Sequence, residues 1–205
     1  MAAEKESDLR EKLLESARKL IVDKGYRGFS LREVARKTDV SATSIYIYFE
    51  NKDHLIHTLI EQSINELNAR LKSLMAAYID PMERLEGFAE AYIEYALEHP
   101  REYQIIYIVS SDEMSRYPKE KFRQARQGYE LLTESIQEAV DKGLINESNP
   151  RLTAYTIWAQ LHGVMSVVLS KRLDIRIDQH EFIEQSISNI IHGFQVRTSL
   201  EPQKI

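Results

Sequence analysis

Helix starts and stops recur along the whole chain and leave little room for other secondary structure. Ser30, Ser41 and Asn51 each precede a segment with apolar residues at helical spacing, as N-cap residues do. Gly25 and Gly143 follow such segments, where glycine commonly ends a helix. Only 7 glycines and 5 prolines occur in 205 residues, and no segment shows sustained strand alternation. The sequence therefore predicts an all-α fold of about nine helices.

These helices divide into two expected domains. Residues 8–60 predict a small three-helix domain, in which two short capped helices fit into residues 30–49. Residues 61–197 predict a larger helical domain for ligand binding and dimerisation. A rod over 52–77, about 39 Å long at ~1.5 Å per residue, connects the two. Its successors are expected at 81–98, 103–107, 119–142, 150–172 and 178–197, with a polar break at 110–118 and frayed ends over the first 7 and last 8 residues.

Composition excludes several classes of protein. The chain has no cysteine, which removes disulfides, thiolate metal sites and a cysteine nucleophile. The N-terminus is charged rather than typical of a signal peptide, and the chain has no stretch of about 18 uncharged apolar residues, so no membrane span is expected. We therefore expect a cytoplasmic protein that does not bind a membrane, a metal or a cofactor. His54 and His57 lack acidic residues at ligand spacing, and no catalytic motif is present, so an enzyme is not expected.

The net charge of −5 is unevenly distributed along the chain. Residues 57–205 carry sixteen lysines and arginines against twenty-two acidic residues. Residues 24–52, in contrast, carry six against three, a net charge of +3. A basic patch on an acidic protein favours nucleic-acid binding at that end alone.

Residues 30–49 have the spacing of a helix-turn-helix. Small Ala35 is expected at the crossing of the two helices, while Val40 and Ile45 face the core. Small polar groups and one phenol would then face outward, as in a helix that reads the major groove. As an isolated pattern, the corner fits a DNA reader and a plain packing corner equally. The outward positions are Ala42, Thr43, Ser44, Tyr46 and Ile47.

The run VSATSIYIYFENKDHLI over residues 40–56 resembles the signature of the TetR family. That signature reads V-S-x-x-x-(I/L/F)-Y-x-Y-F, followed by a helix start of the form (S/N)-K-(E/D)-x-L. Gly25-Tyr26, Phe29-Ser30 and the run LREVA over 31–35 match the family's lead-in. Asp39 replaces the usual glycine, which is tolerable because aspartate accepts a left-handed backbone better than most residues. Thr43 stands where glycine or proline is common, so the base preference is expected to differ.

The resemblance implies a transcriptional regulator that binds double-stranded DNA. It implies a ligand-responsive repressor acting as a dimer on a palindromic operator. The sequence does not decide between a repressor and an activator of transcription. Lys52 is also the first residue of a predicted helix, where a cation opposes the helix dipole. The sequence shows no local partner that offsets this cost, which indicates a phosphate as its partner. The residues that the resemblance assigns to DNA contact are Arg32, Ala42, Thr43, Ser44, Tyr46, Tyr48 and Lys52.

The last two predicted helices carry more apolar surface than one core requires, which predicts a homodimer built from 150–172 and 178–196. The expected interface residues are Ile157, Leu161, Val164 and Val168, with a row of small or short residues formed by Ser186, Asn189 and Gly193.

Aromatic residues predict an effector pocket for an apolar or aromatic small molecule, including acyl derivatives. The alternative is a filled core, which would make the protein an architectural or partner-controlled DNA binder without an effector. An enclosed cavity lined by Tyr92, Tyr95, Tyr107 and Trp158 would favour the sensor. Residues 158–163 also resemble the W-x-x-x-H-G element of one C-terminal subgroup of the family. The expected pocket residues are Phe88, Tyr92, Tyr95, Tyr103, Tyr107, Trp158 and His162.

Overall fold

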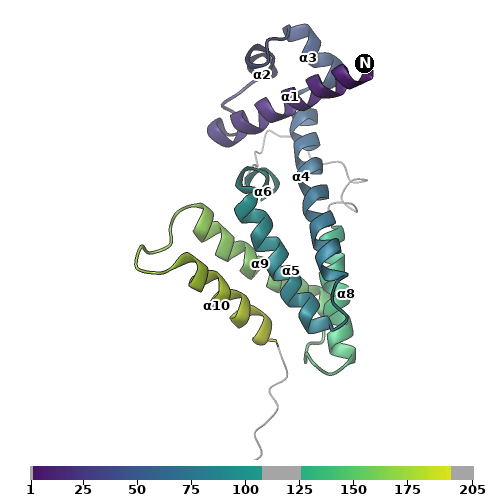
Figure 1. Cartoon of the computed structure of the whole chain (residues 1–205), viewed down its shortest axis with the longest axis vertical. Helices are drawn as coiled ribbons and strands as arrows, with labels where there is room; N and C mark the ends of the chain where they lie inside the picture. The colour runs from purple at the N-terminus through teal and green to yellow at the C-terminus, as the bar shows by residue number, and fades with distance from the viewer. Residues whose placement is uncertain (1, 108–125, 195–205) are drawn as a thin grey trace, which may run out of the picture. The chain divides into compact units, whose positions relative to one another are not determined.

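A computed structural model of the chain describes residues 2–107 and 126–194, which form nine α-helices and no strand (Figure 1). The predicted all-α fold is confirmed. The helices are α1 (Ala2–Lys24), α2 (Leu31–Lys37), α3 (Ala42–Tyr48), α4 (Lys52–Met75), α5 (Pro81–Glu98), α6 (Pro100–Tyr107), α8 (Gln127–Asp141), α9 (Pro150–Leu169) and α10 (Gln179–His192).

The predicted helix starts are confirmed by their caps. The Ser30 hydroxyl accepts a hydrogen bond from the backbone N–H of Glu33 at 3.3 Å, and that of Ser41 accepts one from Ser44 at 3.0 Å. Asn51 caps α4 in the same way through the N–H of His54, at 2.8 Å. Each cap satisfies one of the backbone donors that a helix start leaves without a carbonyl partner.

Three helices end in the same left-handed turn. The residues after the C-caps of α2, α8 and α9 are Asp39, Gly143 and Lys171, with φ of 56°, 71° and 56°. In α9 the N–H of Lys171 donates to Val168 and that of Arg172 donates to Val167, which is the Schellman pattern. The expected left-handed conformation of Asp39 is confirmed, whereas the sequence did not predict the one at Lys171.

The observed helix boundaries differ from the predicted ones by a few residues at helix ends. Helix α1 begins at Ala2, although the first seven residues were expected to fray. Helix α8 covers 127–141 of the helix predicted at 119–142, and its first seven positions lie outside the described residues, as does the predicted break at 110–118. Helix α9 ends at Leu169, before the predicted position 172, because the Schellman turn terminates it.

The chain forms two compact units. The first contains Met1–Asn68 and Tyr95–Ala125, and the second contains Ala69–Glu94 and Arg126–Ile205. Helices α4 and α5 therefore each contribute to both units. The core of the first unit includes Leu13, Leu20, Ile45, Phe49 and Leu59, and that of the second includes Leu132, Ile136, Ala154 and Met165. The functional domains 8–60 and 61–197 stay a prediction.

Helix α9 is long and apolar enough to cross a membrane by length and composition, alone among the described helices. Thr153, Gln160 and His162 interrupt its apolar sequence, so it is not a continuous run of 18 apolar residues. A third of its apolar window is buried within the chain, and it packs against both α8 and α10. Core helices of soluble proteins pass the same test, so this helix is weak evidence for a membrane span.

Candidate nucleic-acid interface and aromatic cluster

Helices α2 and α3 form the predicted helix-turn-helix corner. Ala35 and Ile45 are buried where the two helices pack together. The left-handed backbone of Asp39 and the bond from the Val40 N–H to the Ala35 carbonyl turn the chain sharply after α2. The corner therefore holds α3 by packing on one side and leaves its other side in solvent.

The outer face of α3 has the predicted residues, but not all are equally accessible. Ala42 and Thr43 are exposed, as is Arg32 on α2, and the side chain of Tyr46 is 50% exposed. Ser44 is half-buried, and its hydroxyl lies 2.7 Å from that of Ser41. Further exposed residues of α2 and α3 were not among the predicted contacts, namely Arg36, Lys37 and Ile47.

Tyr48 packs partly against the core of the first unit and is half-buried, with its ring centroid 6.5 Å from that of Phe49. Helix α3 contains neither acidic nor basic residues, so no negative charge on this helix repels a phosphate backbone. The exposed cations come instead from α2.

Lys52 has partners within the protein. Its ammonium nitrogen donates a hydrogen bond to the carbonyl oxygen of Phe29 at 2.9 Å. It also lies 4.2 Å from the ring centroid of Tyr26 and 4.6 Å from that of Phe29. The argument that a cation at this helix start lacks a local partner is therefore wrong, because a carbonyl and two ring faces stabilise it.

Four of the predicted pocket residues are connected in the second unit. Phe88 and Tyr92 of α5 stack with ring centroids 6.3 Å apart, and the Tyr92 hydroxyl lies 3.4 Å from Nδ1 of His162. His162 stacks on Trp158 at 5.4 Å between centroids. Burial lowers the pKa of His162, because removal from water disfavours the charged imidazole.

The sequence missed two aromatic residues that extend this cluster. Tyr155 lies 5.1 Å from Trp158 between ring centroids, and Tyr129 of α8 lies 5.9 Å from Tyr155. The tyrosine at 155 does follow the helical spacing of Trp158 and His162, but Tyr129 comes from a helix that no local pattern places beside them. We call this chain of six neighbouring side chains the aromatic ladder. In order of contact, it consists of Phe88, Tyr92, His162, Trp158, Tyr155 and Tyr129.

The other three predicted pocket residues lie in the first unit. Tyr95 donates its hydroxyl hydrogen to the carbonyl of Ser63 at 3.0 Å, and burial raises the pKa of this phenol. Tyr103 and Tyr107 of α6 pack together at 4.9 Å between centroids. Tyr95 and Tyr103 are both buried, as in the filled-core alternative. The seven predicted pocket residues therefore divide between the two units, four in the second and three in the first.

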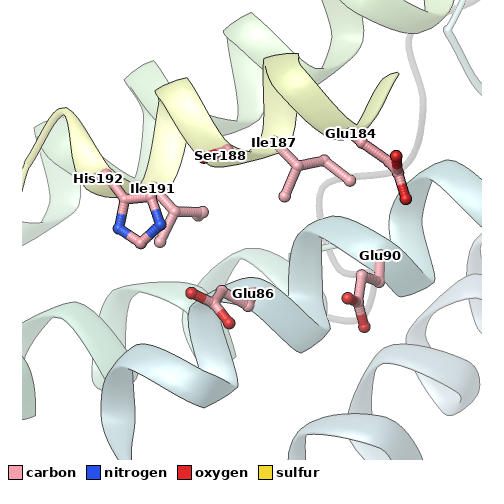
Figure 2. Close-up of a pocket in the computed structure, with 7 residues that line it drawn as sticks. All are labelled: Glu86, Glu90, Glu184, Ile187, Ser188, Ile191 and His192. Atoms are coloured by element: carbon pink, nitrogen blue, oxygen red, sulfur yellow. The ribbon is translucent and has the colours of Figure 1, made fainter. Parts of the chain in front are cut away.

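A pocket of about 200 Å³ opens in the second unit between α5 and α10 (Figure 2). Two glutamates of α5 lie on one side of it, and a glutamate, two isoleucines, a serine and a histidine of α10 lie on the other. None of the predicted pocket residues lines it. Its lining residues are Glu86, Glu90, Glu184, Ile187, Ser188, Ile191 and His192.

The predicted dimer residues do not form one exposed surface. Ile157 and Leu161 have no exposed surface in a single chain, and Val168 is also buried. The assignment of these three side chains to a partner contact is wrong, because they pack in the core of their own protomer. Val164 and Ser186 are half-buried, while Asn189 and Gly193 are exposed.

The exposed side of α9 is instead apolar and partly small. Leu152 is 61% exposed and Tyr155 is 55% exposed, and Ala159 and Gly163 follow on the exposed side. A side chain added at Gly163 would meet open space.

Together, the α2–α3 corner and the helical body define a helix-turn-helix transcriptional regulator. Residues 13–59 match the pattern described as "Bacterial regulatory proteins, tetR family", and residues 85–190 match "Tetracyclin repressor-like, C-terminal domain". The chain belongs to the TetR family of transcriptional regulators.

Named relatives and solved structures agree with this assignment. The HTH-type transcriptional repressor KstR2 of Mycobacterium tuberculosis is 25% identical over 135 residues, which cover 63% of this chain and 67% of that protein. The uncharacterized HTH-type transcriptional regulator YvkB of Bacillus subtilis is 24% identical over 193 residues, 89% of this chain and 95% of that protein. The crystal structure of AibR in complex with isovaleryl coenzyme A and operator DNA aligns with a TM-score of 0.72 at 20% identity, covering 91% and 97% of the two chains.

Proposed function

We propose that this protein is a cytoplasmic repressor, without enzymatic activity, that binds a palindromic operator as a homodimer and releases it when a small effector binds. The exposed face of α3 carries the proposal, because a capped helix held against α2 presents small polar groups and a phenol outward. We assign base and phosphate contact to this face and to α2, through Arg32, Ala42, Thr43, Ser44, Tyr46 and Tyr48. Lys52 is left out of this group because its ammonium is bound to Phe29.

Selection of bound sequences from a pool of random duplexes tests operator recognition. We expect an inverted repeat whose half-sites lie about one helical turn, 34–36 Å, apart. Thr43→Ala should change the enriched half-site, because Thr43 lies on the exposed face of α3. Ser73→Ala, an exposed hydroxyl on α4, is the matched control and should leave the half-site unchanged. Recovery of no common sequence from the wild-type protein would refute the proposal.

We assign the dimer contact to the exposed apolar side of α9. A two-fold axis across this face pairs two α9 helices in antiparallel orientation, so residues near its middle meet their own copies. Ala159 and Gly163 lie there, and small side chains let two helix backbones approach closely. Leu152 and Tyr155 then cover the ends of the contact.

Cysteine cross-linking tests this interface cleanly, because the natural chain has no cysteine. Oxidation of Ala159→Cys or Gly163→Cys should yield a disulfide-linked species of twice the 23.9 kDa chain mass. Ser73→Cys places an equally exposed thiol on α4 and should stay monomeric on a denaturing gel. Equal cross-linking of all three variants would contradict the assignment.

The aromatic ladder is our candidate for the effector contact in the second unit, and an apolar or acyl effector suits its chemistry. The acyl thioester bound by AibR, a protein of the same fold, supports this choice. Isovaleryl coenzyme A is therefore the first probe: it should raise the melting temperature of the protein and release bound duplex. Tyr92→Phe and Trp158→Leu should each reduce the shift. No release by acyl or aromatic probes would favour the architectural alternative.

A further inference from the structure

The contact between Lys52 and Phe29 closes the helix-turn-helix at its base. The ammonium of Lys52, the first residue of α4, donates to the Phe29 carbonyl across 23 positions of sequence. Phe29 immediately precedes Ser30, the N-cap of α2. The chain between these two points contains α2, the turn and α3 and nothing else. One hydrogen bond thus joins the entry and the exit of the whole reading motif.

Two further side-chain contacts hold the same junction. The Tyr26 hydroxyl donates to Oδ1 of Asp53 at 2.7 Å, so the neighbour of Lys52 fixes the ring that lies under the ammonium. Lys24, the last residue of α1, pairs with Glu33 in the first turn of α2 at 2.7 Å. Tyr26, in the segment between α1 and α2, is therefore attached to α4, and the end of α1 is attached to α2.

The partners of Lys52 compensate for an unfavourable position of its charge. A cation at a helix N-terminus is repelled by the helix dipole, so a lysine held there requires compensation. The carbonyl of Phe29 and the faces of two aromatic rings provide it, and Phe29 itself is buried. An apolar side chain would pack against the rings but has no donor for the Phe29 carbonyl.

We infer that Lys52 is a positioning residue for DNA binding: it clamps Phe29 to the start of α4 and thereby fixes the placement of α2 and α3. The inference rests on the proposed use of α3 as the reading helix. A phosphate ligand and a clamp make different predictions for this lysine. Loss of a phosphate contact reduces the dependence of binding on salt, whereas loss of a clamp loosens the reading motif and leaves that dependence unchanged.

The test compares Lys52→Met and Lys52→Arg with Lys72→Met, an exposed lysine in the last turn of the same helix. Binding of a mixed-sequence 30-base-pair duplex is measured by anisotropy over a salt series, and amide hydrogen exchange is measured on the full chain. We expect Lys52→Met to weaken binding about fivefold, the upper size of a solvent-accessible cation–aromatic contact, with an unchanged salt slope. Exchange should accelerate in α2 and α3 and stay unchanged in α8 and α9.

Lys52→Arg should restore both measurements, because a guanidinium also donates to a carbonyl and stacks on aromatic rings. Tyr26→Leu should change both measurements in the same direction but less, because it removes one ring face and the bond to Asp53 and leaves the bond from Lys52 to the Phe29 carbonyl. A salt slope lowered by about 0.9 in Lys52→Met, with normal exchange in α2 and α3, would overturn the clamp in favour of a phosphate contact. If the wild-type protein fails to bind duplex DNA, the proposed function fails, and the exchange of α2 and α3 still decides the clamp by itself.

Discussion

At the scale of single residues, the stack of His162 on Trp158 provides an optical reporter inside the aromatic ladder. Trp158 is the single tryptophan of the chain, and the two rings lie nearly parallel at 18°. A protonated imidazole quenches indole emission, while the neutral ring does so far less. Burial lowers the pKa of His162 from its ordinary value of 6.5, so the imidazole is neutral at pH 7.

We therefore expect Trp158 fluorescence to fall as the pH is lowered, with a midpoint below 6.5. The sign follows from the lowered pKa: the folded state releases the proton more readily than the unfolded chain, so stability also declines as the pH falls through 6.5. A pH titration of emission measures the midpoint, and His162→Gln should abolish the transition. A midpoint above 6.5 would contradict the burial of this imidazole.

At the scale of elements, the left-handed residues that end α8 and α9 can be compared directly. Lys171 and Gly143 occupy equivalent positions in two Schellman turns, but only glycine adopts this backbone without a steric cost. Lys171→Gly should stabilise the protein by about 1 kcal/mol, and Gly143→Ala should destabilise it by a similar amount. Chemical denaturation measures both changes.

Gly143→Ala causes no steric clash, because a Cβ added at Gly143 meets no atom within 4 Å, so the comparison reports the backbone alone. Asp39→Gly, at the third such turn, should change stability less than Lys171→Gly, since aspartate tolerates the left-handed region. Equal changes in stability at Asp39 and Lys171 would show that the position in the turn, and not the type of residue, determines the cost of the left-handed backbone.

The same elements show what the sequence could predict. Helix starts at Ser30, Ser41 and Asn51 were predictable because a cap joins residues three apart. The turn at Lys171 was not, because lysine gives no signal for a left-handed backbone. Lys52 illustrates the same limit at a candidate site: its type and motif were visible, but its partner lies 23 positions away and depends on the packing of α1, α2 and α4.

The dimer face was mispredicted for a related reason. Helix α9 is apolar around most of its circumference, so periodicity could not separate the side that packs in the protomer from the side that faces a partner. Ile157 and Leu161 belong to the first side, and Leu152 and Tyr155 belong to the second. The packing of α8 and α10 on α9 makes this choice, and no local pattern encodes it.

At the scale of the whole molecule, the uneven charge makes DNA binding depend on the number of reading units. Residues 24–52 carry the net charge of +3, while the remainder of the chain is acidic and is repelled by the duplex. A dimer brings two such patches to one DNA molecule, so it should displace twice as many counterions as a monomer.

A variant that disrupts the α9 face should therefore bind DNA with about half the salt slope of the wild-type protein. Leu152→Glu places a charge on that face, and because the side chain is 61% exposed in one protomer, the protomer should still fold. Sedimentation should show the mass of one chain, and affinity at low salt should fall more than the loss of one contact predicts, because linkage of the two reading units is lost.

Leu97→Glu, at an exposed leucine of α5, is the matched control and should retain the dimer mass and the full slope. A monomeric Leu152→Glu protein with an unchanged slope would mean that one reading unit makes all the phosphate contacts, and the two-fold operator would then have to be abandoned.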